Sequence, residues 1–325
     1  MSKGKSSVVF SLLAALALTS ACARTETTQT NAPQPSPTQA QPTPQQSAAA
    51  DGASYEQELE AWKAKRLASL KSEDGWLTLI GLFWFKEGEN RFGSDPTNEI
   101  VLPEGKSPAL AGTIRLAAGK VTLEANPDAK ITLKGQPVTT LELKSDEDGE
   151  PTVLEMGTLS FHVVKRGERL GLRVKDRENP ARAAFKGNEY FPADRRWVVN
   201  ARFEPYQPPK QVPILNVLGM ETEETSPGAL AFEVDGRPYK LEALKEKGEE
   251  QFFIIFADQT SGHETYGAGR YLYAAPPGAD GVVRLDFNKA YSPPCAFTKY
   301  ATCPLPPAQN RLPLRVEAGE KFAGH

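Results

Sequence analysis

The sequence predicts a mainly β fold, an antiparallel sandwich or barrel-like body preceded by one amphipathic helix. Short apolar runs separated by Gly, Pro and Asp follow one another along most of the chain after residue 75. Hairpin turn residues such as Asp235-Gly236 stand between several of these runs. The chain has 325 residues, of which 39% are hydrophobic and 24% charged, so it is long enough to bury a sizeable core.

The single helical pattern lies in residues 54–71. Ser54 and Gln57 have the spacing of a capping box, so we expect the helix to begin at Ser54. Gly75 is expected to stop the chain from continuing as a helix. The apolar residues recur at roughly helical spacing, with charged residues between them: Tyr55, Leu59, Trp62, Leu67 and Leu70.

The first residues of the chain have the features of a bacterial secretory signal. Lys3 and Lys5 precede an apolar run over residues 8–18, which is too short to span a membrane. The stretch "LTSAC" resembles a lipobox, which predicts a signal peptide over residues 1–21 and lipidation of Cys22. The alternative is a plain signal peptide with an incidental cysteine.

Residues 23–53 contain no Val, Ile, Leu, Met or aromatic residue. Such a segment buries too little apolar surface to offset its ordering entropy, so residues 22–53 are expected to be a lipidated cysteine and a disordered tether. The body, residues 54–325, would then be held at a membrane of the cell envelope, on its extracytoplasmic side. The net charge of −3 without a basic tract argues against nucleic acid as a partner.

Within the body, turns at Ala118-Gly119, Arg166-Gly167-Glu168 and Asp235-Gly236 predict three hairpins, and further strands are expected between residues 250 and 288. The polar stretch "SDEDGEP", residues 145–151, suggests a seam between two subdomains. The first part of the body, with "GENRFGSDPTNEIVLPE" and "ITLKGQPV", is similar to forkhead-associated domains. Ser94 stands where that family has its phosphate-binding arginine, so the resemblance implies the fold and not phosphothreonine binding.

Cys295 and Cys303 remain after Cys22 is assigned to the lipid anchor. An even pair in an exported protein predicts a disulfide. A metal site and two unpaired thiols are the alternatives, but no CxxC motif or neighbouring histidine supports a metal. We therefore expect no metal and no cofactor.

The stretch "FADQTSGHETYGAGRYLY", residues 256–273, delivers many polar groups and several glycines at the end of an apolar strand. It predicts a ligand-binding loop. The alternative is a hydrogen-bonded turn whose polar groups satisfy its own backbone and whose arginine pairs internally. The candidate ligand-binding residues of this loop are Asp258, Thr260, Ser261, His263, Tyr266 and Arg270.

A second candidate loop, residues 286–313, is stiffened by six prolines. Asp286, Asn288 and Asn310 are its candidate ligand-binding residues, and the alternative is a lid whose Asn and Asp side chains satisfy loop backbone groups. We expect the two loops to meet at one end of the body and to expose their polar groups together.

Three hypotheses follow for the function. The first is a non-catalytic binding protein for a small polar or carbohydrate-like molecule. The second is a hydrolase that acts on envelope material through acidic residues such as Asp258 and Asp286. The third is a structural envelope protein without a ligand. The sequence leaves open whether the protein is an enzyme.

Several long stretches resemble a bacterial family of unknown function, domain-of-unknown-function family number 1684. They include "GWLTLIGLFWFKEGENRFGSD", "FPADRRWVVNARF", "FADQTSGHETYGAGRYLY" and "DFNKAYSPPCAFTKYATCPLPP", and together they span most of residues 54–325. The resemblance implies a predominantly β fold and frequent occurrence as an exported lipoprotein. It implies no activity, substrate or catalytic residue.

Overall fold

The computed structural model describes residues 44–322, with side chains from Ser54 onward. The described residues from Ala49 onward form one compact unit, which contains the body. The predicted signal peptide, Cys22 and most of the predicted tether lie outside the described residues. The predicted mainly β class is confirmed, because antiparallel sheets make up most of the body.

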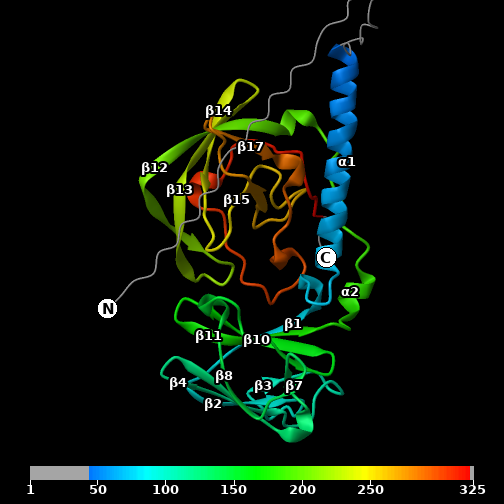
Figure 1. Cartoon of the computed structure of the whole chain (residues 1–325), viewed down its shortest axis with the longest axis vertical. Helices are drawn as coiled ribbons and strands as arrows, with labels where there is room; N and C mark the ends of the chain where they lie inside the picture. The colour runs from blue at the N-terminus through cyan, green and yellow to red at the C-terminus, as the bar shows by residue number, and fades with distance from the viewer. Residues whose placement is uncertain (1–43, 323–325) are drawn as a thin grey trace, which may run out of the picture. The chain divides into compact units, whose positions relative to one another are not determined.

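The helix α1 spans Pro44–Leu70, and its part from Ala49 onward lies beside the body strands (Figure 1). It begins at Pro44, so Ser54 lies inside the helix and is not its cap, and residues 44–53 of the expected tether are helical. The reason is propensity: this stretch holds several alanines, and a helix propagates cheaply once later turns are formed. The predicted apolar face is confirmed at Tyr55, Leu59 and Leu70, which are buried.

The first β-rich part is a two-layer sandwich. Its sheets have the orders β1-β11-β10-β9-β6-β7 and β3-β2-β4-β5-β8, and apolar side chains of both sheets share one core around Phe92 and Phe161. All pairs are antiparallel except β2 with β3. The strands are β1 (Leu79–Trp84), β2 (Gly88–Gly93), β3 (Ile100–Val101), β4 (Gly112–Ala117), β5 (Lys120–Ala125), β6 (Thr132–Leu133), β7 (Gln136–Pro137), β8 (Thr140–Leu143), β9 (Leu154–Met156), β10 (Leu159–Arg166) and β11 (Arg169–Asp176).

The second β-rich part is a half-barrel, in which a four-stranded sheet of order β14-β13-β12-β17 packs against the hairpin β15-β16 (Figure 1). Its core gathers Trp197, Phe232, Phe256 and Phe287. The short helix α2 (Pro180–Ala184) precedes it. The strands are β12 (Val198–Leu215), β13 (Glu221–Val234), β14 (Arg237–Ala243), β15 (Phe252–Phe256), β16 (Arg270–Ala274) and β17 (Val282–Asp286).

The three predicted hairpins are present as β4-β5, β10-β11 and β13-β14. At the last of them Asp235 and Gly236 have φ values of 51° and 72°, the left-handed pair that a tight hairpin turn requires. The stretch at 145–151 is not the boundary between the two cores. It contains a capped 3-10 turn (Asp146–Asp148) between strands of the sandwich, and the core changes only after Asp176.

Candidate functional site

Asp258 and Arg270 form a buried ion pair. Both side chains are 0% exposed, and Nη2 of Arg270 donates to Oδ1 of Asp258 at 3.1 Å. Oδ2 of Asp258 accepts from the backbone N–H of Val316 at 2.8 Å. Arg270 also donates to the carbonyl oxygens of Val316 and Ala318. The pair therefore ties the Gly-rich loop to the C-terminal segment, and its charges neutralise each other.

The hydroxyl groups of this loop complete the same network. Thr260 Oγ1 donates to the Asp258 carboxylate at 2.9 Å and lies 2.9 Å from the hydroxyl of Thr265. Ser261 Oγ accepts from the Asp258 backbone N–H at 3.2 Å. Thr260 and Thr265 are buried, so these groups are bonded to the protein itself.

His263 and Tyr266 lie farther along the loop. His263 is exposed and lines none of the cavities described below. The Tyr266 hydroxyl donates to the carbonyl of Cys295 at 3.2 Å, and its ring packs edge-on against Phe322. The Gly-rich and Pro-rich loops therefore touch, as the sequence analysis expected.

Asp286 and Asn288 form a second network with Tyr55 of α1. The Tyr55 hydroxyl donates to Oδ1 of Asp286 at 2.9 Å and accepts from Nδ2 of Asn288 at 2.9 Å. Asn288 also donates to the carbonyl of Asp194 and accepts from its N–H. Burial, together with the neighbouring Asp286, raises the pKa of Tyr55 well above its usual range. This network fixes α1 on the body.

Asn310 bridges two strand ends. It is 0% exposed, its Oδ1 accepts from the backbone N–H of Glu242 at 2.6 Å, and its Nδ2 donates to the carbonyls of Glu242 and Ile255 at 3.0 and 2.9 Å. These three hydrogen bonds of the Asn310 amide link β14 to β15.

Seven of the nine candidate residues belong to three separate networks, His263 and Tyr266 lie outside them, and the nine do not converge on one open site. Irregular loops carry many backbone N–H and C=O groups that need partners when buried, and these side chains supply them. The alternative given in the sequence analysis, polar side chains that hold the loops together, thus describes the contacts of Asp258, Arg270 and Asn310. Asp286 alone lines one of the cavities described below.

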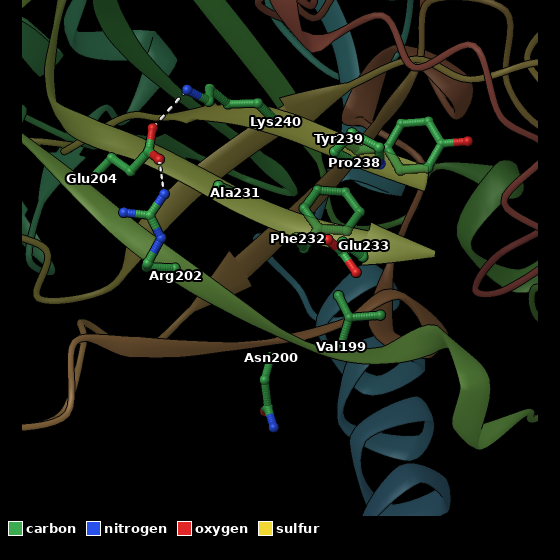
Figure 2. Close-up of a pocket in the computed structure, with 10 residues that line it drawn as sticks. All are labelled: Val199, Asn200, Arg202, Glu204, Ala231, Phe232, Glu233, Pro238, Tyr239 and Lys240. Atoms are coloured by element: carbon green, nitrogen blue, oxygen red, sulfur yellow. Dashed lines mark hydrogen bonds and ion pairs between the residues drawn. The ribbon is translucent and has the colours of Figure 1, made fainter. Parts of the chain in front are cut away.

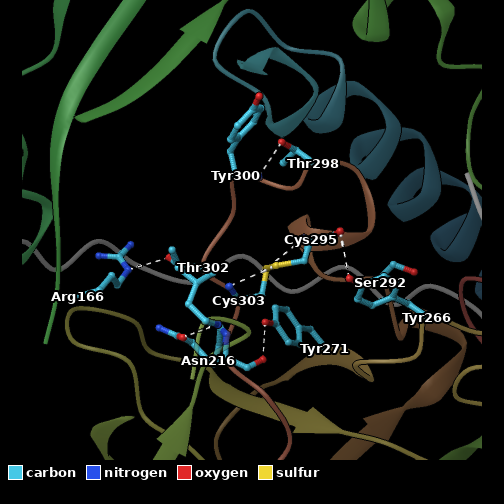
Figure 3. Close-up of a disulfide and its surroundings, with 12 residues drawn as sticks. Arg166, Asn216, Tyr266, Tyr271, Ser292, Cys295, Thr298, Tyr300, Thr302 and Cys303 are labelled. Atoms are coloured by element: carbon cyan, nitrogen blue, oxygen red, sulfur yellow. Dashed lines mark hydrogen bonds between the residues drawn. A yellow bond between two sulfur atoms is a disulfide. The ribbon is translucent and has the colours of Figure 1, made fainter. Parts of the chain in front are cut away.

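Cys295 and Cys303 are joined by a disulfide with Cα atoms 6.1 Å apart (Figure 3). The Cys303 carbonyl accepts from the N–H of Val217, and the hydroxyl of Tyr271 donates to the carbonyl of Pro304 at 2.9 Å. The predicted disulfide thus braces the Pro-rich loop against the half-barrel.

Next to this disulfide is a cavity of about 440 Å³ that the sequence analysis did not predict. It receives side chains from α1, from the sandwich strands β10 and β11, from β16 and from the Pro-rich loop. We call it the arginine–tyrosine pocket and define it by Arg66, Trp76, Arg166, Arg173, Tyr273 and Tyr291.

Arg173 on β11 is the unusual member of this pocket. It is 6% exposed, yet its guanidinium donates only to Thr302 Oγ1, at 3.4 Å, and its buried Nε has no partner among the described residues. Its closest ring contact is Trp76, 5.4 Å from the guanidinium carbon to the ring centre. Burial and the nearby Arg166 lower the pKa of Arg173 to about 10, while the charge of Asp146 opposes this shift. The side chain remains a cation at neutral pH.

The two other arginines of the pocket have acidic partners. Arg166 pairs with Asp146 at 2.8 Å, and its Nε donates to Thr302 Oγ1 at 3.0 Å (Figure 3). Arg66 of α1 pairs with the buried Glu320 at 2.9 Å. The hydroxyl of Thr302 therefore accepts from two guanidinium groups, of which only one is neutralised by an ion pair.

Tyr273 and Tyr291 supply aromatic walls. Their rings are stacked, with centroids 6.4 Å apart and planes inclined by 17°, and Tyr273 also stacks on Phe253. The Tyr273 hydroxyl donates to Glu246 at 2.8 Å. Burial raises the pKa of Glu246 and raises the pKa values of Tyr271, Tyr273 and Tyr291, so the phenols stay protonated at neutral pH.

Two further cavities are found among the described residues. One of about 590 Å³ shares Arg66, Tyr273 and Tyr291 with the arginine–tyrosine pocket and continues along α1 to Asp286. The other, about 770 Å³, lies over β12, β13 and β14 (Figure 2). There Glu204 pairs with Lys240 at 2.6 Å and with Arg202, so the charges are already matched.

Within residues 44–322 no group of three or more His, Cys, Asp or Glu side chains is placed to hold a metal ion. No helix in the same part of the chain has the length and apolar character needed to cross a membrane.

The sequence gives little signal for this pocket. Arg173 alternates with Leu172 and Val174, which face the sandwich core, so the pattern predicts an outward-facing, solvated arginine. It is buried because the segment around Thr302 covers that face of the sheet, a contact between distant parts of the chain.

Comparison with known proteins assigns the half-barrel region to a family. Residues 183–321 match the family model described as "Protein of unknown function (DUF1684)". The match covers the second β-rich part, a shorter segment than the resemblance in the sequence implied. No curated protein matches the chain.

Two solved structures are similar to parts of the chain. One is an uncharacterized protein of Haloarcula marismortui, solved by solution NMR, with 33% identity, a TM-score of 0.38, and coverage of 44% of this chain and 80% of that one. The other comes from work on phosphothreonine-dependent FHA domain interactions, with 19% identity, a TM-score of 0.21, and coverage of 30% and 96%. The fold described above rests on the strands of this chain and not on these similarities.

Proposed function

We propose that this protein is a non-catalytic ligand-binding protein of the bacterial cell envelope, and that the arginine–tyrosine pocket binds a small polar or carbohydrate-like molecule. The volume of about 440 Å³ falls within the range of roughly 300–1,000 Å³ typical of small-molecule sites. The pocket combines flat aromatic faces with hydrogen-bonding groups, as such sites commonly do.

One observation carries the proposal: Arg173 is buried at the pocket without a neutralising partner among the described residues. A buried charge without a counter-charge reduces stability. Proteins retain such strained arrangements mainly where function requires them. A ligand would supply the missing partner.

The test is a binding screen of the full chain by thermal shift and isothermal titration calorimetry, with neutral sugars, sugar acids, sugar phosphates and amino acids. A bound ligand raises the unfolding temperature by mass action. We expect Tyr273→Ser to abolish the shift, because Tyr273 forms a wall of the pocket and is 38% exposed, which should permit folding.

Tyr239→Ser is the matched control, because Tyr239 lines the cavity over β12, β13 and β14. It should leave binding unchanged. Loss of binding in the Tyr239 variant alone would place the ligand in that other cavity and refute the assignment.

The envelope location rests on the lipobox-like "LTSAC" and the apolar-poor segment that follows it. A disulfide is also typical of exported proteins and supports it. Cys22→Ser should move the protein from the membrane fraction to the soluble fraction and prevent incorporation of labelled palmitate. Unchanged fractionation and labelling would refute the anchor.

Hydrolysis is the second candidate, favoured by the raised pKa of Glu246. Glu246 is, however, the sole Asp or Glu among the described residues that line the pocket, whereas glycosidases of the common type need two carboxyl groups. Glu246→Gln should therefore preserve ligand binding, and no product should form during prolonged incubation of the wild type with any ligand found.

A further inference from the structure

We infer that the ligand of the arginine–tyrosine pocket is a sugar-like ring bearing an anionic group, a carboxylate or a phosphate, and that Arg173 and Arg166 bind this group. The inference rests on the proposed function, since it names the class of ligand for the same pocket.

The two guanidinium groups converge on a single acceptor. Arg173 and Arg166 donate to Thr302 Oγ1 at 3.4 and 3.0 Å. A guanidinium carries five N–H donors, so one threonine hydroxyl leaves most of the donors of Arg173 unused. Carboxylate and phosphate oxygens match guanidinium groups in geometry as well as in charge. Because Thr302 accepts from both arginines, its own hydrogen is left to donate to an anion.

Two charged groups of the pocket have no ion-pair partner among the described residues, the guanidinium of Arg173 and the carboxyl group of Glu246. Arg66 is paired with Glu320 and Arg166 with Asp146. Glu246, the acid of the pocket, forms no ion pair with a described residue and is bonded to Tyr273. Arg173 is therefore the positive charge without a partner, and one anionic group on the ligand would compensate it.

The remaining lining groups suit a hydroxyl-rich ring. Tyr273 and Tyr291 line the pocket, and Tyr273 is 38% exposed, so it leaves aromatic surface that can pack against the C–H groups of a sugar. Glu246 can accept hydrogen bonds from hydroxyl groups. The adjoining cavity of about 590 Å³ shares Tyr273 and Tyr291, so a second ring could extend along α1.

The experiment compares matched ligands by calorimetry on the full chain: glucose, glucuronate and glucose 6-phosphate, and galactose with galacturonate. We expect at least one anionic sugar to bind at least about tenfold more tightly than its neutral partner. The uronates and the phosphate distinguish the two kinds of anion. Arg173→Met should remove this advantage and leave the affinity for the neutral sugar unchanged.

Arg115→Met is the control, because Arg115 is an exposed arginine of the sandwich that pairs with Glu89. It should bind anionic sugars as the wild type does. Equal binding of neutral and anionic sugars would overturn the inference and leave the proposed function standing. Binding of no member of the wider screen would count against both.

A second readout does not depend on the folding of any variant. His162 of β10 lies opposite Arg173 of β11 in the strand register, and the charge of Arg173 helps to hold the His162 pKa low. Saturation with the anionic sugar should raise the pKa of His162 measured by NMR, because the anion offsets that charge. Tight binding with an unchanged His162 pKa would place the anion elsewhere and overturn the inference.

Discussion

Arg270 and Arg173 are two buried arginines to which the protein gives very different surroundings. Arg270 is 0% exposed and faces Asp258 and two backbone carbonyls. Arg173 is 6% exposed and has one long hydrogen bond to Thr302. Both leave a buried Nε without a partner, so the difference lies in the counter-charge and in the other nitrogens.

We interpret this difference as one between a structural role for Arg270 and the proposed ligand-binding role for Arg173. Arg270 joins the Gly-rich loop to the C-terminal segment through Asp258 and two backbone carbonyls. These partners lie within the protein, so we assign Arg270 no part in ligand binding. Arg173 faces a cavity with most of its donors unused, and a ligand is the simplest partner. Substitutions of the two arginines should therefore act in opposite directions.

The largest effect is expected for Arg270→Met. It leaves the buried carboxylate of Asp258 without its cation, and breaking one partner of a buried pair typically costs about 3–5 kcal/mol. Urea denaturation should show this loss of unfolding free energy. The double variant Arg270→Met with Asp258→Leu should recover part of it, whereas additive losses would show that the pair is not coupled.

The pH dependence of the unfolding free energy tests whether burial and the charge of Arg173 lower the pKa of His162. Burial, then Arg173, Lys175 and Arg166, lower the pKa of His162 from 6.5 to about 4, while Asp146 opposes the shift. Between these pH values the unfolded chain binds a proton that the folded protein does not. The unfolding free energy should therefore fall by up to roughly 3 kcal/mol as the pH drops from about 6.5 to about 4.

The check is a series of urea denaturations across this pH range, with His162→Gln as the variant. The slope should be markedly smaller in the variant. An equal slope in both proteins would contradict the lowered pKa of His162.

The smallest effect is expected for Arg166→Met. Arg166 and Asp146 are both about one quarter exposed at the side chain, at 24% and 23%, so their ion pair is partly solvated. We expect a change of about 1 kcal/mol or less in the unfolding free energy, measured by urea denaturation. A loss of unfolding free energy as large as that of Arg270→Met would contradict the proposed difference between the arginine–tyrosine pocket and the Asp258–Arg270 network.

The β class, the three hairpins and the disulfide could be predicted from the sequence because each depends on a local pattern or a cysteine pair. The start of α1 and the boundary between the two cores could not. The alanines before Ser54 extend the helix beyond the capping box, and the polar stretch at 145–151 is a capped turn inside the sandwich.

For the candidate site, the two polar loops could be predicted from the sequence, but the inward direction of their side chains could not. Asp258, Arg270 and Asn310 face inward because loop backbone groups need partners, a demand that depends on the tertiary fold. Arg173 was missed for the opposite reason, since nothing in strand 169–176 indicates that its outer face is covered by the segment around Thr302.

The most direct test of the central claim is the unfolding free energy of Arg173→Met in the absence of ligand. If Arg173 is an unpaired charge kept for a ligand, methionine should leave the stability unchanged or raise it by about 1–3 kcal/mol, while Arg270→Met lowers it. A loss of about 3 kcal/mol or more in the Arg173 variant would contradict the account, because it would show that Arg173 is as much a part of the closed structure as Arg270.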